Sequence, residues 1–407
     1  MKSNKAMRVV VADYSGHPFQ IELSRCLASR GHDVLHLHFS EFQTPKGSMA
    51  PQPSDAESFH VVGVSLGAPF AKQKFLRRRF QEAKIGTLFA ARAMEFRPDI
   101  VIGCNMPLDA QLKLQRACAT SGIGFIFWLQ DIYSSAISHY LGARFGLLGQ
   151  VVGLYYQNLE GRLLRASNAV VAISDYFTET LLRWKVSQAQ INLIPNWAPL
   201  SEIHPQAKDS SWSRRHGLTD KKVALYTGTL GLKHDPLLLL DLARAGQAQG
   251  LQVTVASEGP AANWLADQAA ALGVDNLLVL PFQPMELYSQ LLGAGDIMLA
   301  MVGAEAAEFS VPSKIFSYLA AGKPIVAAIK DSNDAARMIC EADAGSITAP
   351  GDTNAFIAQV LKLAAFPELC DRLGANGRAF AEKHFAIEPI ADRFEALLSQ
   401  VLAETLQ

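Results

Sequence analysis

The sequence predicts an α/β protein of two domains, each a parallel sheet with Rossmann-like alternation of strands and helices. Its 407 residues are too many for one ordinary core and fit two domains of about 200 residues each. Short apolar runs, typical of parallel strands buried on both faces, alternate with segments of helical period. The hydrophobic content of 49% and the charged content of 18% are those of a folded protein.

The composition excludes several classes of protein. A net charge of −1 argues against a general nucleic-acid binder, so no nucleic-acid partner is expected. The five cysteines form no CxxC pair and are odd in number, which argues against a disulfide framework or zinc site and fits a reducing cytosol. No run of 18 apolar residues is present, and the first apolar run ends at Asp13, so neither a membrane span nor a signal peptide is expected.

The first half begins with a βαβ unit. Residues 7–12 predict a buried strand, followed by a helix over 19–30 and an alternating strand over 33–39. Ligands bind at the carboxyl edge of parallel sheets, so Gly16 and His17, in the loop after the first strand, are expected to approach a substrate. The loop lacks a GxGxxG pattern, which argues against dinucleotide binding.

Two histidines, His36 and His38, lie two residues apart on a predicted strand and therefore point to the same face. This spacing could serve a metal, but no third ligand stands at a matching position. Packing is the favoured interpretation.

The strand predicted at 125–129 ends in Gln130 and Asp131, again at the carboxyl edge. A carboxylate there could orient a sugar hydroxyl or accept a proton. The alternative is an N-cap for the next helix, and a functional role is favoured.

Two stretches of the first half have the composition of a membrane-facing surface. Residues 70–97 predict a basic, aromatic helix, either lying on anionic lipid or exposing an ordinary solvated face. The residues expected to contact the membrane are Lys72, Arg77, Arg78, Phe75 and Phe80. Residues 141–159 carry one charge and several glycines, and could receive a lipid tail or form a buried packing segment. Of these two, buried packing is favoured.

A proline-rich polar stretch at 195–221 interrupts the alternation and marks the domain boundary. A second α/β series follows, beginning with a strand at 223–227. The turn after this strand contains Gly228 and Thr229, and its glycine allows close backbone approach to a phosphate. Lys233 would supply a point charge there.

A short helix predicted to begin at Pro312 and end at Gly322, with Ser310 or Val311 as its N-cap, is the expected centre of the chemistry. The face expected to pack on the sheet comprises Ile315, Phe316, Leu319 and Ala320. The face expected to line a cleft comprises Lys314, Ser317 and Ala321. A helix N-terminus beside a lysine suits a ligand with phosphate and hydroxyl groups, although an ordinary βαβ helix is the alternative.

Ordered motifs give the chain a family resemblance. The segments YTGTLGLKHDP, ASEGP, LPFQP and VPSKIFSYLAAGKPIVA resemble the second domain of GT-B glycosyltransferases of the retaining family four, in its bacterial capsule, O-antigen and exopolysaccharide branch. The segments RGHDVLHLHF, FIFWLQDIY, AVVAIS and LIPNWAP resemble the first domain. The resemblance implies two Rossmann-like domains facing a central cleft: an acceptor domain over 1–198, a nucleotide-sugar domain over 199–385, and a C-terminal helix over 386–407 packing back on the first.

The resemblance also implies roles for individual residues. Lys233 matches the family's diphosphate-binding position, and Lys314 with the turn at Pro312 and Ser313 would assist it. The remaining residues expected to bind the donor are Gly228, Thr229, Glu258, Gly259, Phe282, Gln283 and Ser317. Those expected on the acceptor side are Gly16, His17 and Gln130.

The sequence departs from the family in two places. The family's paired glutamates fall on Phe309 and Ser317, which leaves Glu308 as a neighbouring carboxylate for catalysis. The family's histidine after the WLQD strand is Gln130, so Asp131 is the nearest ionisable group and the expected catalytic residue there.

These features predict sugar transfer, with retention, from a UDP-linked sugar to a polyprenyl-diphosphate-linked saccharide. The enzyme would act from the cytoplasm on the inner face of the membrane, and the resemblance implies that it needs no metal or other cofactor. Two alternatives remain: a sugar-nucleotide epimerase of the same fold, which would need no acceptor, and a non-catalytic protein of polysaccharide assembly, consistent with the missing glutamates.

Overall fold

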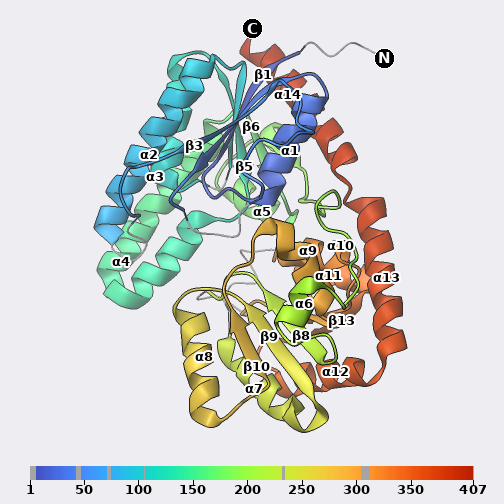
Figure 1. Ribbon diagram of the computed structural model, residues 1–407. Helices are drawn as coiled ribbons and strands as arrows, with labels where there is room; N and C mark the ends of the chain where they lie inside the picture. The colour runs from blue at the N-terminus through green and yellow to red at the C-terminus, as the bar shows by residue number, and fades with distance from the viewer. Residues whose placement is uncertain are drawn as a thin grey trace. The chain divides into compact units, whose positions relative to one another are not determined.

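The computed structural model describes residues 6–42, 47–70, 75–104, 106–231, 234–303 and 312–406, apart from the side chains at 75, 76 and 143. The chain divides into two compact units (Figure 1). Unit 1 contains Met1–Pro195 and Ile387–Gln407, and unit 2 contains Asn196–Ala386. The sequence predicted boundaries after residues 198 and 385, which lie three residues and one residue from these transitions.

Unit 1 is built on a parallel sheet of seven strands in the order β3-β2-β1-β4-β5-β6-β7. Continuous apolar runs form its central strands, and Val9, Val10 and Val11 are fully buried. The strands are β1 (Arg8–Asp13), β2 (Asp33–Phe39), β3 (Phe59–Val64), β4 (Ile100–Cys104), β5 (Gly124–Leu129), β6 (Ala169–Ala172) and β7 (Ile191–Leu193). The helices are α1 (Pro18–Ser29), α2 (Phe75–Phe96), α3 (Leu108–Thr120), α4 (Tyr133–Arg165), α5 (Tyr176–Arg183) and α14 (Ile387–Thr405), with a 3-10 turn at Gln188–Gln190.

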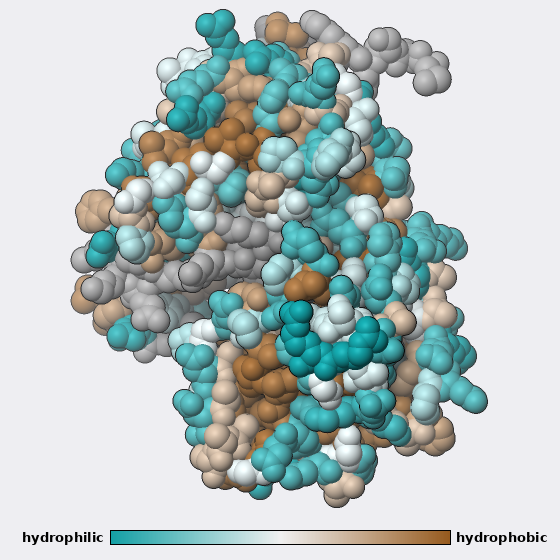
Figure 2. Space-filling model, viewed as in Figure 1, coloured by the Kyte–Doolittle hydropathy of each residue, from teal (hydrophilic) through white to brown (hydrophobic). Residues whose placement is uncertain are grey.

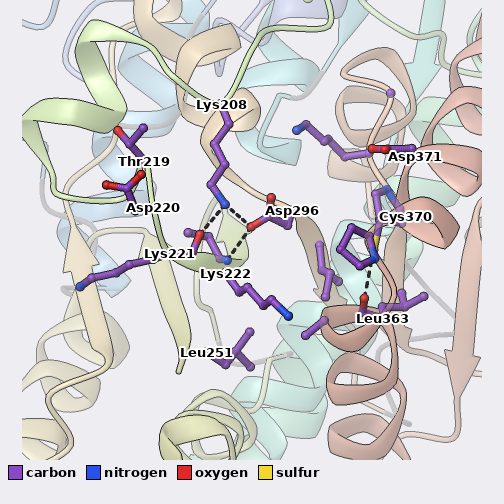
Figure 3. Close-up of a pocket in the computed structure, with 17 residues that line it drawn as sticks. Lys208, Thr219, Asp220, Lys221, Lys222, Leu251, Asp296, Leu363, Cys370 and Asp371 are labelled. Carbon is purple, nitrogen blue, oxygen red and sulfur yellow. Dashed lines mark hydrogen bonds and ion pairs between the residues drawn. The ribbon is translucent and has the colours of Figure 1, made fainter. Parts of the chain in front are cut away.

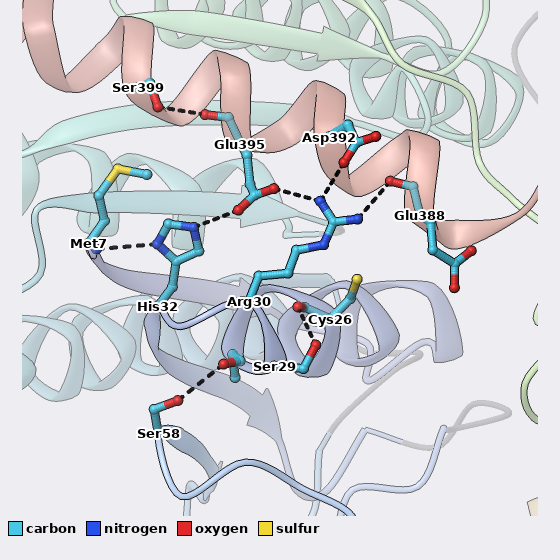
Figure 4. Close-up of polar contacts among 11 residues, drawn as sticks. Met7, Cys26, Ser29, Arg30, His32, Ser58, Glu388, Asp392, Glu395 and Ser399 are labelled. Atoms are coloured by element: carbon cyan, nitrogen blue, oxygen red, sulfur yellow. Dashed lines mark hydrogen bonds and ion pairs between the residues drawn. The ribbon is translucent and has the colours of Figure 1, made fainter. Parts of the chain in front are cut away.

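The last helix, α14, packs on the sheet and on α1 of unit 1. Arg30 Nη1 lies 2.5 Å from Glu395 Oε2, and His32 Nε2 lies 3.0 Å from Glu395 Oε1 (Figure 4). On its apolar side, the ring of Phe394 lies 4.9 Å from that of Trp128 on β5. An ion-paired carboxylate and an aromatic contact therefore hold α14 against residues distant in sequence.

His36 lies in the core of unit 1. Its side chain is fully buried, its Nδ1 hydrogen-bonds Ser24 Oγ at 2.9 Å, and burial lowers its pKa to about 3. Among the described residues no group of three or more metal-ligating side chains occurs. The favoured packing interpretation is confirmed for His36.

The segment 141–159 meets the favoured expectation of buried packing only in part, because Leu141, Tyr156 and Leu159 are buried but the residues next to its turn are exposed. It lies in α4, where Gly146 (φ 54°, ψ −130°) breaks the helix and turns the chain back. The arms pack so closely that a Cβ on Gly153 would approach Ser138 Oγ to 2.4 Å. Leu147 and Leu148, next to the turn, are 80% and 77% exposed, because the core of unit 1 lies at the other end of the hairpin.

Unit 2 is built on a parallel sheet of six strands in the order β10-β9-β8-β11-β12-β13. The strands are β8 (Lys222–Thr227), β9 (Leu251–Ala256), β10 (Leu277–Leu280), β11 (Ile297–Met301), β12 (Ile325–Ala328) and β13 (Gly345–Thr348). The helices are α6 (Ser211–Arg215), α7 (Pro236–Gly246), α8 (Pro260–Leu272), α9 (Met285–Ala294), α10 (Lys314–Ala320), α11 (Asp334–Glu341), α12 (Thr353–Ala365) and α13 (Pro367–His384), with a 3-10 turn at Gln247–Gln249.

The core of unit 2 lies between its sheet and the flanking helices, and includes Tyr226, Leu239 and Phe356. The edge strand β10 is only half-buried along its length. In Figure 2, brown hydrophobic surface gathers where Figure 1 has β9 and β10. Two parallel sheets with intervening helices confirm the predicted fold class.

Candidate functional site

The loop after β8 brings its backbone close to α10 in unit 2. Gly228 follows the last residue of β8 with φ +99°, a backbone conformation that side chains disfavour. Its N–H donates to the carbonyl oxygen of Ala256 at 3.0 Å, which ties the loop to the end of β9. A Cβ at Gly228 would lie 3.6 Å from Lys314 Cε, so the glycine backbone and the lysine side chain are neighbours.

Lys314, the first residue of α10, is held beside this loop by an aromatic ring. Its Nζ lies 3.6 Å from the ring centroid of Tyr226, within the range of a cation–π interaction. The Tyr226 hydroxyl donates to the carbonyl oxygen of Thr229 at 3.0 Å. The ring therefore fixes both the cation and the loop that contains Gly228 and Thr229, a geometry suited to an anionic ligand.

Tyr318, which the sequence analysis did not assign, joins three elements at the same edge of the sheet. The Thr227 N–H donates to its hydroxyl at 3.0 Å, and this hydroxyl donates to the carbonyl oxygen of Leu299 at 3.2 Å. Burial raises the pKa of Tyr318. Its spacing of four from Lys314 places both side chains on one side of α10, which was the available sequence signal.

Ser317 belongs to the same hydrogen-bonded group. Tyr288 hydrogen-bonds Thr227 Oγ1 at 3.0 Å and also hydrogen-bonds Ser317. Burial raises the pKa of Tyr288, while these two hydrogen bonds lower it. The serine at the position of a family glutamate therefore lies beside a tyrosine hydroxyl.

The start and faces of α10 differ from those predicted. The helix begins at Lys314 rather than Pro312, and its N-cap is Ser313, whose side chain makes no capping hydrogen bond. The alternatives for the N-cap, Ser310 and Val311, lie outside the described residues. Pro312 is buried, and its carbonyl oxygen accepts from Ile315 N at 3.1 Å.

Ala321, expected to line a cleft with Lys314 and Ser317, is instead buried. It lies where α13 packs against α10, and Arg378 of α13 donates to the carbonyl oxygen of Ala320 at 2.6 Å. The second helix occupies this side, so only part of the expected polar face is open to a ligand.

A second cluster lies at the carboxyl ends of β9 and β10. Glu258 is exposed, and its Oε1 accepts from the backbone N–H of Phe282 at 3.1 Å, while Gly259 has φ +107°. Gln283 Oε1 accepts from Trp212 Nε1 at 2.9 Å. The structure thus brings together four of the residues expected to bind the donor, with the Gln283 amide hydrogen-bonded to Trp212.

Several expected site residues lie outside the described residues. These are Lys233, Glu308 and Phe309 in unit 2, and Lys72 in unit 1. Near the first of them, Gly231 N donates to His234 Nδ1 at 2.9 Å.

In unit 1, the loop after β1 contains the two expected acceptor residues Gly16 and His17. Gly16 is buried with φ +75°. His17 is the N-cap residue of α1, and burial lowers its pKa to about 4, so its ring is neutral at neutral pH. Asp13 Oδ1 accepts from the Ser15 N–H at 3.0 Å and so shapes the start of this loop.

Gln130 and Asp131 follow β5 at the same edge and are half-buried. The N-cap position of α4 is Ile132, and the carboxylate of Glu160 accepts from the Tyr133 N–H at 3.0 Å and the Ser134 N–H at 2.9 Å. Capping of α4 is therefore performed by Glu160 rather than by Asp131. The capping role of Glu160 could not be predicted from the sequence, because the whole hairpin of α4 separates it from Tyr133 and Ser134.

A pocket of about 270 Å³ lies at the amino ends of the strands in the sheet of unit 2 (Figure 3). Its lining includes the residues at which strands begin, among them Lys222, Leu251 and Ile297. Lys208 and Asp296 form an ion pair on one side. Among the described residues, none of those expected to bind the donor or the acceptor lines this pocket, and parallel sheets bind ligands at the carboxyl ends of their strands.

Comparisons with known proteins agree with this two-unit arrangement. The model of the glycosyl transferase 4-like domain matches residues 20–197, and that of glycosyl transferases group 1 matches residues 209–380. The chain is 24% identical over 315 residues to WcaI of Escherichia coli K12, described as a colanic acid biosynthesis glycosyl transferase, with 74% of this chain and 76% of that protein covered.

Solved structures share the fold. Sucrose-phosphate synthase from Thermosynechococcus elongatus matches with a TM-score of 0.72 and 16% identity, covering 98% of this chain and 100% of that one. Anabaena HepE in complex with UDP-glucose matches with a TM-score of 0.65 and 17% identity, covering 98% and 99%. WaaG, a glycosyltransferase of lipopolysaccharide biosynthesis, matches with a TM-score of 0.68 and 15% identity, covering 96% and 99%.

The two domain models cover complementary parts of the chain in the order in which its two units occur. The full-length structural matches show the same fold. The chain therefore belongs to the GT-B glycosyltransferases of family four, with a glycosyl transferase 4-like domain followed by a glycosyl transferases group 1 domain.

Proposed function

We propose that this glycosyltransferase moves a sugar, with retention, from a UDP-linked donor to a polyprenyl-diphosphate-linked saccharide in bacterial surface polysaccharide biosynthesis. The description of WcaI and the UDP-glucose bound to HepE support the pathway class and the donor class. The enzyme would work in the cytoplasm at the inner face of the membrane. Among the described residues no helix is long and apolar enough to cross a bilayer.

The placement of Lys314 carries the donor side of the proposal. Its Nζ rests on the Tyr226 ring, next to the positive-φ backbone of Gly228. When the bond between the sugar C1 and the diphosphate oxygen breaks, the electron pair stays on the diphosphate. A cation already fixed at that position stabilises the developing charge without reorganisation. Lys233 is proposed as a second such cation, so that the transfer needs no metal.

The other donor contacts follow from the two clusters of unit 2. Pro312, Ser313 and Thr229 would lie along the diphosphate. Glu258, Gly259, Phe282 and Gln283 would lie beside the nucleoside. Ser317 would take the place of the family glutamate near the ribose, with Tyr288 hydrogen-bonded to it.

The acceptor would bind unit 1 at the loops after β1 and β5. Gly16, His17 and Gln130 are proposed to contact the acceptor saccharide. Asp131 is proposed to orient the attacking hydroxyl or accept its proton. Glu308 is proposed as a further catalytic carboxylate.

Nucleotide binding tests the donor side. UDP, GDP, ADP and dTDP are compared by thermal shift, because a ligand that binds the folded state raises its melting temperature. We expect a shift with UDP that Lys314→Ala weakens, with an affinity loss of about tenfold or more. The control is Lys383→Ala, an exposed lysine near the end of α13. Equal shifts in the parent and the Lys314→Ala variant would refute the role of Lys314.

Product analysis separates the two alternatives. An epimerase would convert a UDP-sugar without acceptor, whereas a transferase would release UDP in an acceptor-dependent manner. A non-catalytic assembly protein would give no shift with any of the four nucleotides.

A further inference from the structure

We propose that the hairpin tip of α4, residues 144–155, together with the neighbouring exposed residues of α2, docks on an anionic phospholipid bilayer. The inference rests on the proposed function only for the identity of the membrane. The physical case comes from the shape, exposure and charge of this part of unit 1.

The hairpin is a stable projection formed by closely packed arms. After the turn at Gly146, the second arm of the hairpin runs back along the first, and it contains Gly149 and Gly153. A Cβ on Gly149 would meet the carbonyl oxygen of Leu141 at 1.9 Å. At the base of the hairpin, Glu160 binds the backbone of Tyr133. Side chains at the tip therefore project from a fixed scaffold.

The tip exposes large apolar side chains close together. Leu147 and Leu148 are the most exposed, and several neighbours are more than half exposed. These neighbours are Phe145 at 54%, Val151 at 64% and Leu154 at 58%. Contiguous apolar surface of this kind marks an interaction site, whereas scattered single residues do not.

The charges around the tip are positive. Residues 133–159 contain no aspartate or glutamate, and Arg144 is exposed with its guanidinium 5.8 Å from the ring of Phe145. The arginine can therefore remain at the headgroups while the apolar residues enter the boundary with the acyl chains.

Helix α2 extends the same surface. Arg79 donates to the Tyr155 hydroxyl at 3.5 Å and lies 5.4 Å from its ring, which places α2 beside the tip. Arg77 is exposed, and Phe80 is 76% exposed. Glu82, the only acid in the first five turns of α2, is buried and paired with Arg78 at 2.7 Å.

The proposed surface includes only some of the residues that were expected to contact the membrane. Arg77 and Phe80 belong to the proposed surface. The Arg78 guanidinium is engaged by Glu82, which reduces its availability for lipid phosphate. Lys72 and the side chain of Phe75 lie outside the described structure.

The positive charge of this surface favours an anionic bilayer over a second copy of the chain as its partner. In a symmetric contact through the tip, Arg144 and Arg77 of both copies would meet at one interface, and like charges there oppose association. An anionic bilayer instead offers phosphate to the arginines and hydrocarbon to the leucines. An apolar patch beside exposed arginines, in a segment 133–159 that contains no acid, has the composition of an interfacial anchor.

Vesicle co-sedimentation of the full chain tests this proposal. We expect it to bind vesicles of equal parts phosphatidylcholine and phosphatidylglycerol, and to bind phosphatidylcholine alone much more weakly. Replacing Leu147 and Leu148 together by serine should lower the affinity about tenfold or more. Arg77→Gln with Arg144→Gln should lower it mainly at low salt. The control is Leu272→Ser, which alters a 54% exposed leucine in unit 2.

Two outcomes would overturn the assignment: no binding of the parent to anionic vesicles, or equal binding by the double leucine variant. A dimer in solution that the leucine variant converts to a monomer would assign the tip to self-association instead. Thermal shift with UDP separates this result from the proposed function, because the leucine variant should keep the shift of the parent. Loss of vesicle binding alone would not contradict the proposed sugar transfer. Loss of the UDP shift alone would not contradict the proposed membrane-binding surface.

Discussion

Glu160 allows a quantitative prediction about the pH dependence of unit 1. Its carboxyl group is fully buried and accepts hydrogen bonds from the backbone of Tyr133 and Ser134. Burial raises the pKa of this group from 4.5 to about 7, even though the hydrogen bonds lower it. Between these values the folded protein holds a proton that the unfolded chain has lost.

The sign of the effect follows from this difference. The contribution of Glu160 to stability is fully present below pH 4.5 and is lost as the pH rises through about 7. The difference between the two pKa values corresponds to about 3 kcal/mol in the free energy of unfolding. Glu160→Gln removes the titration. We therefore expect the variant to lose less stability than the parent between about pH 5 and about pH 8, by up to ~3 kcal/mol.

The assay is urea unfolding of parent and variant across this pH range, comparing the change with pH rather than the absolute stability. This comparison is needed because the side-chain amide introduced by Glu160→Gln would face one of the two backbone donors with an N–H group and so lose a hydrogen bond at every pH. Glu57→Gln, which alters an exposed carboxylate, serves as the control. If the parent and the Glu160→Gln variant lose equal stability with rising pH, burial does not set the pKa of Glu160 as described.

Two further predictions concern the edge of the second sheet. Gly228→Ala places a side chain at φ +99° without a steric clash, so we expect a loss of about 1 kcal/mol or more in unfolding free energy, together with a weaker UDP-induced thermal shift; an unchanged melting temperature would contradict the assigned backbone conformation. Tyr318→Phe leaves the buried Thr227 N–H without the hydroxyl that accepts from it, so calorimetry should show a loss of about 1–3 kcal/mol, and a neutral result would mean that another group takes its place.

The strands were predictable because parallel strands buried on both faces leave continuous apolar runs in the sequence. The predicted strand at 33–39 coincides with β2. In both units, strands and helices alternate along the chain as the apolar runs predict. The placement of residues after strand ends followed from the same rule, because a loop after a parallel strand must emerge at the carboxyl edge. For this reason, Gly228 and Asp131 could be assigned to the carboxyl edges of their sheets from the sequence alone.

What could not be predicted depends on contacts between distant residues. Tyr318 stands in an apolar helix and has the sequence signature of a core aromatic, and only the fold shows that its hydroxyl bridges β8 and β11. The burial of Ala321 depends on α13, far along the chain. The exposure of residues 144–155 depends on the direction in which a hairpin projects, which no local pattern specifies. The glycines of that segment indicate that its two arms pack closely, so this part of the hairpin's structure could be predicted from the sequence.

The position of α14 has a consequence for how the protein is made. Helix α14 completes unit 1, yet the whole of unit 2 separates it from the rest of that unit in the sequence. During synthesis, unit 2 can therefore finish folding while unit 1 still lacks the helix that covers Trp128 and pairs with Arg30. The first unit to be translated is the last to be completed.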